Sequence, residues 1–335
     1  MSSTPAVYRS DFIKRPKLFR VWEQYRNRPS IQYAMELFSE ALGVFFYTYA
    51  GIGATAPYII GNILKINGLG TPFQAGWGYG FGVVFALVVC AATSGGHINP
   101  CITIAFAIFR GFPVKKVPGY ILAQIFGAYV ASILTYNQWK VFILDAEAVL
   151  KQAGLYDQLQ FTPSGPAGIF ALYLPPGQTY GSVFLNEFTN CAFVALVIWA
   201  CIDPTNILVP PVAAPLVIGM AYAVAIWGYA VPGIALNTAR DVGARLMAIT
   251  YWGPAAAGGR YAALTALTNI PATLFAICIY EIFLTDSDRV VTAAHMEHGR
   301  LNVEHRRLGK QAAQVGATSD ASVKQSISEY EHARV

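Results

Sequence analysis

The sequence has little charge. Charged residues make up 12% of its 335 residues, against roughly 25% in a typical soluble domain, while hydrophobic residues make up 55%. Most of the charge lies at the two ends, as a basic segment before residue 32 and a mixed-charge segment after residue 285. The formal net charge of +5 therefore describes the ends of the chain. It predicts no nucleic-acid partner, and the composition indicates an integral membrane protein in a lipid bilayer.

The sequence also lacks the patterns that most enzymes and metalloproteins carry. Its five cysteines fall in or beside apolar runs without a metal-type spacing, and they are expected to be small buried hydrophobes. We find no nucleophile–base pair, phosphate-binding loop or cluster of metal ligands in the sequence. No catalytic residue, metal or cofactor is therefore expected.

What the sequence does contain is a series of apolar segments. Six of them are expected to cross a bilayer: 32–58, 76–93, 117–136, 182–202, 212–228 and 262–284. The half-helices expected at 99–110 and 237–247 are too short, because a span needs about 20 residues. Short apolar helices after Gly-rich or small-residue backbone are typical of re-entrant segments. A basic arm (1–31) precedes the first span, a long loop (140–180) follows the third, and a polar tail (285–335), disordered over 311–335, ends the chain.

The order of span, span, half-helix and span occurs twice. A repeated unit with three spans must be inverted in the membrane, and inverted repeats build a site near the midplane from broken helices. The predicted fold class is an all-α membrane protein with six transmembrane helices and two re-entrant half-helices. Both termini then lie on one side, and the Arg and Lys residues before the first span predict that this side is cytoplasmic.

An asparagine stands at the start of each half-helix. Asn99 precedes Pro100, which suits the first helical position, and Asn237 precedes Thr238. Half-helices entering from opposite faces would bring both amides to the midplane, where two positive helix ends repel cations. Backbone carbonyls before each asparagine would complete a path for water or a neutral, hydroxyl-bearing solute. These pore-lining residues are Gly95, Gly96, His97 and Ile98 in the first stretch and Ile234, Ala235 and Leu236 in the second.

Three further polar residues lie in or beside these stretches. Arg240 is a cation in the first turn of a half-helix, where it is disfavoured, so we interpret it as a donor at a constriction. The alternative is a structural arginine paired with Asp241, which is itself expected to be structural. His97 either packs in the cytoplasmic vestibule or senses pH.

Carboxylates near the starts of the first and fourth spans are the remaining candidates. Glu36 and Glu187 are expected to accept backbone N–H groups of the re-entrant loops, which a dry region would otherwise leave unpaired. Glu40 is expected at the membrane interface.

At the two asparagine stretches the sequence resembles the major intrinsic protein family, the aquaporins and aquaglyceroporins. The first stretch reads Ser-Gly-Gly-His-Ile-Asn-Pro-Cys over 94–101 and the second Asn-Thr-Ala-Arg-Asp over 237–241. The family usually has Asn-Pro-Ala and Asn-Pro-Ala-Arg there, so Cys101 and Thr238 depart from its pattern. The resemblance covers roughly 32–284. It implies the aquaporin fold and a homotetramer with one pore per subunit.

The resemblance also implies a four-residue constriction on the extracellular side of the asparagines. The four positions correspond to Arg240, Tyr79 or else Trp77, Ala225 or Ile226, and Ile234. A constriction without histidine, together with Asp241, resembles the glycerol-conducting branch. The predicted function is a passive plasma-membrane channel for water and small neutral solutes such as glycerol. The alternatives are a water-selective or closed channel and a secondary transporter that uses Glu36 or Glu187.

Overall fold

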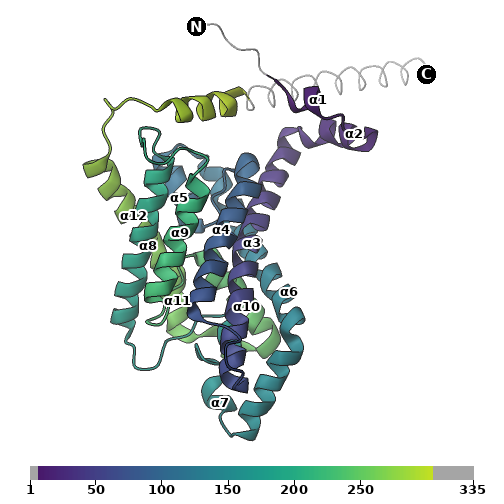
Figure 1. The fold of residues 1–335 in the computed structure, drawn as a ribbon, viewed down its shortest axis with the longest axis vertical. Coiled ribbons are helices and arrows are strands. Elements are labelled where there is room, and N and C mark those ends of the chain that lie inside the picture. The colour runs from purple at the N-terminus through teal and green to yellow at the C-terminus, as the bar shows by residue number, and fades with distance from the viewer. Residues whose placement is uncertain (1–6, 305–335) are drawn as a thin grey trace, which may run out of the picture. The chain divides into compact units, whose positions relative to one another are not determined.

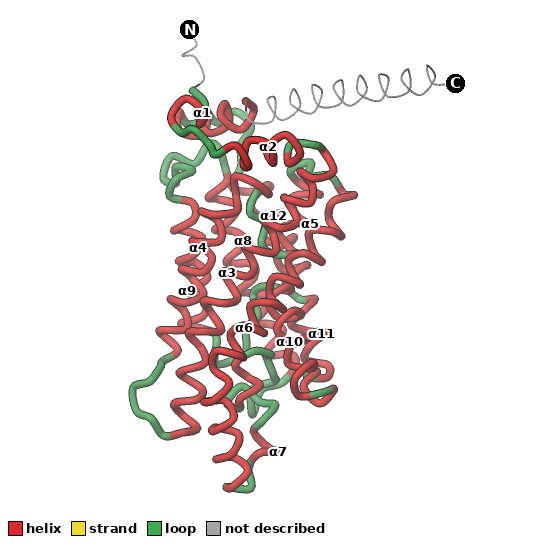
Figure 2. Tube along the Cα trace, turned by 90° about the vertical axis from the view of Figure 1, so that its right-hand side faces the viewer, coloured by secondary structure: helices red, strands yellow, loops and turns green. Residues whose placement is uncertain are grey.

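Helices make up all the regular secondary structure of residues 7–304, the part of the chain that a computed structural model describes (Figure 2). Leu37–Met296 forms one unit and the terminal residues on either side form another. The predicted disorder of 311–335 lies outside the described residues.

The helices of the large unit follow the predicted repeat (Figure 1). The first repeat consists of α3 (Pro29–Leu64), α4 (Pro72–Ser94), the half-helix α5 (Pro100–Phe109) and, after the 3-10 turn η1 (Val114–Lys116), α6 (Val117–Gln152). The second consists of α8 (Tyr180–Ile202), α9 (Ala214–Tyr229), the half-helix α10 (Thr238–Trp252), the turn η3 (Pro254–Ala257) and a last span in pieces, α11 (Gly259–Leu267), α12 (Asn269–Ile279) and η4 (Tyr280–Leu284). The predicted fold class of six spans and two half-helices is confirmed. By length and hydropathy alone, four helical segments within residues 7–304 could cross a membrane, namely Pro72–Ser94, Val114–Gln152, Tyr180–Ile202 and Pro254–Leu284.

The third span differs from its predicted extent. α6 continues to Gln152, so the first part of the expected 140–180 loop is helical. Its 36 residues correspond to about 54 Å of helix, well beyond the ~30 Å apolar layer. The projecting end is fixed through Glu147, whose Oε1 accepts from Trp252 Nε1 at 2.8 Å and Gln160 Nε2 at 3.1 Å. The short helices α7 (Tyr156–Leu159) and η2 (Pro166–Ile169) follow in the remaining loop.

The last span is interrupted before its proline. α11 ends at Leu267 and α12 begins at Asn269, with Thr268 between them. Pro271 has no N–H for the carbonyl of Leu267, four residues earlier, so the helix is weakest at this turn.

Small residues let the helices approach closely. Gly80 of α4 and Gly219 of α9 face each other, because a Cβ on either would meet the other's carbonyl oxygen. In the same way Gly243 of α10 lies against the backbone of Ile125 on α6, and Gly127 of α6 against Ala41 on α3. Such contacts fix the half-helix against its neighbours.

The unit formed by the chain ends contains α1 (Arg9–Phe12), α2 (Lys17–Arg26) and the first residues of α3. The described part of the tail is helical over 293–304.

Candidate functional site

The two half-helices begin with matching caps. Asn99 Oδ1 accepts from Cys101 N at 3.0 Å, and Asn237 Oδ1 accepts from Ala239 N at 2.9 Å. The residue before each asparagine has left-handed backbone, with φ of +43° at Ile98 and +60° at Leu236. This conformation is rare for such side chains, and its occurrence at both positions shows that the two loops are structural copies.

Each asparagine also bonds to the opposite loop. Asn99 Nδ2 donates to the carbonyl of Leu236 at 3.1 Å, and Asn237 Nδ2 donates to the carbonyl of Ile98 at 2.8 Å. Both side chains are buried. An amide nitrogen carries two donors, so the bond to the loop leaves Asn237 a second N–H, while Asn99 Nδ2 also donates to the hydroxyl of Tyr222 at 3.4 Å. The two helix ends and the two amides thus meet at one place.

A buried glutamate supports each re-entrant loop. Glu187 accepts from Ala235 N at 2.6 Å and Leu236 N at 2.9 Å. In the first repeat the acceptor is Glu40. Its carboxylate accepts from His97 N at 3.0 Å and from Ile98 N at 2.7 Å.

The prediction that Glu36 accepts the N–H groups of the first loop is therefore wrong. The prediction that Glu40 lies at the membrane interface is wrong as well, because its side chain is fully buried. Glu36 is one helical turn earlier on α3. The signal that could have identified Glu40 is that no charged residue follows it before Lys65, just as none follows Glu187 before Asp203.

Amides on the third span of each repeat hold these carboxylates. Gln124 Nε2 of α6 donates to Glu40 at 2.7 Å, and Asn269 Nδ2 of α12 lies 3.3 Å from Glu187 Oε1. The sequence reasoning missed Asn269. The hydroxyl of Thr238 lies 2.9 Å from both Asn269 Oδ1 and the carbonyl of Ala266. Thr238 therefore bonds the start of α10 to the interrupted last span, in a position where the family usually has a proline.

The guanidinium of Arg240 is held from two sides. Its Nε and Nη2 lie 3.0 and 2.5 Å from the hydroxyl of Tyr79, and Nη1 donates to the carbonyl of Phe170 at 2.8 Å. Asp241 instead pairs with Arg245 at 2.6 Å, and Arg245 Nη2 donates to the carbonyl of Leu172 at 2.9 Å. Arg240 and Arg245 thus both hold the 170–172 loop, and Arg240 remains at the cavity.

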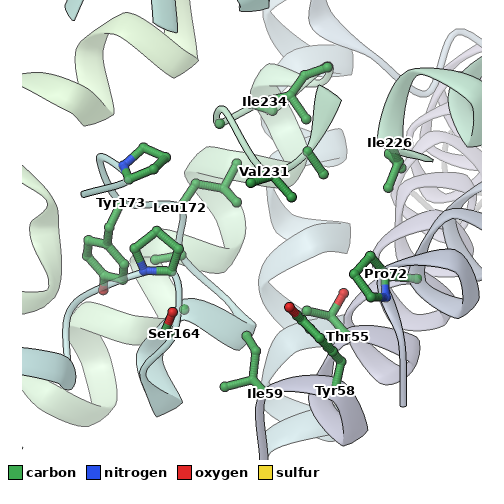
Figure 3. Close-up of a pocket in the computed structure, with 18 of the residues that line it drawn as sticks. Thr55, Tyr58, Ile59, Pro72, Ser164, Leu172, Tyr173, Ile226, Val231 and Ile234 are labelled. Carbon is green, nitrogen blue, oxygen red and sulfur yellow. The ribbon is translucent and has the colours of Figure 1, made fainter. Parts of the chain in front are cut away.

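A cavity of about 440 Å³ (Figure 3) has Arg240 among its lining residues. Four of the expected constriction residues, Tyr79, Ile226, Ile234 and Arg240, line it. Ala225, the alternative to Ile226, is fully buried and is not among the lining residues. Trp77, the alternative to Tyr79, packs against the rings of Phe81 and Trp227. Ala235 and Leu236 of the second loop also line the cavity.

Two further tyrosines belong to this site, and the sequence reasoning missed both. The ring of Tyr47 lies 5.2 Å from that of Tyr79 and 5.5 Å from that of Tyr222. Tyr47 lines the cavity, and the hydroxyl of Tyr222 lies 3.4 Å from Asn99 Nδ2. Tyr47 follows Glu40 by seven residues, which places both on the same face of α3, and this spacing was the available signal.

The first loop closes around His97. Gly95 and Gly96 have φ of +95° and +68°, which favours glycine, and they turn the chain into the loop. The ring of His97 is buried, with ring centroids of Phe106 at 4.6 Å and Phe112 at 4.7 Å. This packing matches the structural alternative for His97.

Comparison with known proteins adds four findings. Residues 28–255 match the model of the family described as "Major intrinsic protein". Aquaporin-3 of Laccaria bicolor is 60% identical over 313 residues, which cover 93% of this chain and 95% of that protein. The glycerol uptake facilitator protein of Pseudomonas aeruginosa is 34% identical over 229 residues, covering 66% and 77%. The X-ray structure of the aquaglyceroporin from Plasmodium falciparum superposes with a TM-score of 0.64 at 23% identity, over 75% of this chain and 97% of that one, which is a likeness of fold.

Proposed function

The chain belongs to the major intrinsic protein family, and from this premise we propose that it is a passive channel that conducts glycerol and similar small polyols besides water. The family makes it an integral multi-pass membrane channel for water and small solutes. The preference for polyols, the homotetramer, the plasma-membrane location and the cytoplasmic termini are parts of the proposal.

The observation that carries the proposal is the reciprocal pair formed by Asn99 and Asn237. Each amide is fixed by the other loop, and each caps a helix whose N-terminus has a partial positive charge. A neutral solute can accept a hydrogen bond from the second N–H of Asn237 as it passes, and from that of Asn99 where the solute replaces the 3.4 Å contact with Tyr222. A cation must give up water next to two positive helix ends, which disfavours its passage.

The lining of the cavity supports passage of polyols. Ile226 and Ile234 provide apolar surface, and Arg240 provides N–H donors from the same constriction. Glycerol has carbon atoms along one side and hydroxyls along the other, so it can meet both kinds of surface together. A histidine, which would make the constriction polar on two sides, is absent from these lining residues.

The burial of Glu187, and of Glu40 in the role expected for Glu36, argues against the transporter alternative. A coupled transporter needs a titratable group that reaches the substrate. Glu40 and Glu187 are fully buried and accept backbone N–H bonds. The geometry therefore favours structural roles for both.

The test is a comparison of glycerol uptake and water flow in proteoliposomes that hold the full chain. We expect both rates to exceed those of empty liposomes, without dependence on a proton or sodium gradient. Raised water flow with glycerol uptake equal to the control would overturn the polyol proposal and leave a water channel. Proton-dependent uptake that is lost in Glu187→Gln would instead favour a transporter.

A further inference from the structure

The N-terminal helix α2 is amphipathic and its apolar face is uncovered. Leu18, Val21, Trp22 and Tyr25 follow the spacing i, i+3, i+4 and i+7, which places them on one stripe of the helix. Each is between 44% and 75% exposed. A stripe of two aromatic and two aliphatic side chains is unfavourable in water, so it calls for a covering surface.

The charge around α2 is strongly one-sided. Between residues 7 and 28 the chain has seven cationic side chains and two carboxylates. One of the carboxylates, Glu23, is already paired with Arg15 at 3.0 Å. On the helix itself, a rotation of 100° per residue places Arg20 opposite the apolar stripe and Lys17 at its edge, beside Val21.

The position of α2 in the chain limits what can cover it. Only Asn27 and Arg28 separate the end of α2 from the start of α3, the first span. α2 therefore cannot lie far from the surface of the bilayer that α3 crosses. We propose that α2 lies in the plane of that surface, with its apolar stripe among the acyl chains and its cations on the headgroups of anionic phospholipids.

The composition of the helix fits this ligand. Interfacial helices have aromatic and aliphatic residues on one face and Lys or Arg on the other, with low net hydrophobicity. Clusters of basic residues next to a transmembrane helix are attracted to anionic leaflets. Arg28 adds to the cluster, since its guanidinium carbon lies 4.8 Å from the centre of the Tyr25 ring. The proposal does not depend on which solute the channel conducts.

The test places a nitroxide spin label on either face of α2 in the full-length protein. Val21→Cys puts the label on the apolar stripe, and Glu23→Cys, about 200° further round the helix, puts it on the opposite face. Cys278→Ser removes the exposed native thiol, while the other four cysteines are buried. Both labelled proteins are reconstituted in nanodiscs of phosphatidylcholine with or without phosphatidylserine. Collisions with oxygen, which dissolves in lipid, are compared with collisions with a water-soluble nickel chelate.

With phosphatidylserine, we expect the label at 21 to collide several-fold more with oxygen than with nickel, and the label at 23 to show the reverse. Lys17→Glu combined with Arg20→Glu is expected to reduce this difference. The same charge change at Lys65 and Lys140, outside the arm, is the matched control. Equal nickel access at both sites in anionic nanodiscs overturns the proposal. If the label at 21 is equally shielded from nickel in nanodiscs of phosphatidylcholine alone, the proposed role of anionic lipid is overturned. If the label is shielded only after a soluble protein is added, the stripe binds a protein partner instead of lipid.

Discussion

The hydroxyl of Tyr79 accepts from both Nε and Nη2 of Arg240, at 3.0 and 2.5 Å. A third N–H of Arg240, on Nη1, donates to the carbonyl of Phe170. A guanidinium has five N–H donors, so two are left for a solute. At the proposed constriction, Tyr79 therefore competes with the solute for the same cation.

Replacing this tyrosine by phenylalanine tests the competition. Tyr79→Phe keeps the ring and removes the acceptor, so Nε and Nη2 become available to solute hydroxyls. We expect the ratio of glycerol to water permeability to rise roughly two- to tenfold, the equivalent of one hydrogen bond. Stopped-flow measurements on proteoliposomes give both rates. Tyr173→Phe is the control, because Tyr173 lines the same cavity but bonds to the carbonyl of Ala256. An unchanged ratio in Tyr79→Phe would show that the hydroxyl does not restrict the solute.

Arg240→Val tests what excludes protons. The substitution removes the buried cation while the two capped helix ends remain. We expect solute flow to persist and proton leakage, followed with a pH-sensitive dye inside the liposomes, to increase. Arg260→Val removes an exposed arginine and is expected to leave the leakage unchanged. If Arg240→Val does not leak, the helix dipoles and asparagines alone exclude protons.

The two buried glutamates predict an order of stabilities. Glu187→Ala leaves the N–H groups of Ala235 and Leu236 without an acceptor, at a cost of about 1–3 kcal/mol for each. Glu187→Gln keeps one acceptor oxygen and is expected to lose less. Thermal unfolding in detergent should therefore give Tm values in the order wild type, Gln, Ala, with the same order at Glu40. Glu36→Ala leaves the bonds to both loops in place, and a loss of Tm there as large as at Glu40 would contradict the assignment.

A loop aspartate predicts how stability depends on pH. Burial by itself would raise the pKa of Asp203, but hydrogen bonds from Thr205 and Tyr280 and the charge of Arg110 outweigh it and hold this pKa below the ordinary 3.8. A carboxylate whose pKa is lower in the folded than in the unfolded state stabilises the folded protein at pH values above its unfolded-state pKa. This stabilisation is lost as the pH falls through the folded-state pKa. Asp203→Asn is therefore expected to lower Tm near neutral pH and to reduce its fall below about pH 4. Asp157→Asn, at an exposed site, is the control, and parallel Tm curves for wild type and Asp203→Asn would contradict the prediction.

The half-helices could be predicted because their signals are local. Asn99 and Asn237 are caps, Pro100 suits a first turn, and a short apolar run is visible without knowing its neighbours. The inverted repeat followed from counting spans. The arrangement of Tyr79, Ile234 and Arg240 around one cavity could be expected only through the family resemblance.

The residues that hold the re-entrant loops and the constriction in place could not be predicted in the same way. The first re-entrant loop lies more than fifty residues from Glu36 and Glu40 in the sequence. Which of the two carboxylates contacts it depends on how α3 is positioned along that loop. The helical end of α6 mixes charged residues with apolar ones, so its sequence has no continuous apolar run, and its anchor on Trp252 is a tertiary contact. Tyr47 carries no motif, and it joins the site only because α3 packs beside Tyr79.

The last prediction concerns the space that Tyr79 occupies. A Cβ at Gly51 of α3 would overlap the ring of Tyr79, whereas a Cβ at Gly53 would meet no heavy atom within 4 Å. Gly51→Ala must therefore displace the ring or separate α3 from α4, at a cost of about 1–3 kcal/mol. We expect a lower Tm and a changed ratio of glycerol to water permeability, because Tyr79 leaves Arg240. Gly53→Ala on the same helix should keep the ratio and raise stability slightly, by about 0.5–1 kcal/mol. If Gly51→Ala lowers Tm but keeps the ratio, the helices have moved apart with the Tyr79–Arg240 contact intact. If it changes the ratio in the same direction as Tyr79→Phe, the position of this one ring controls the constriction.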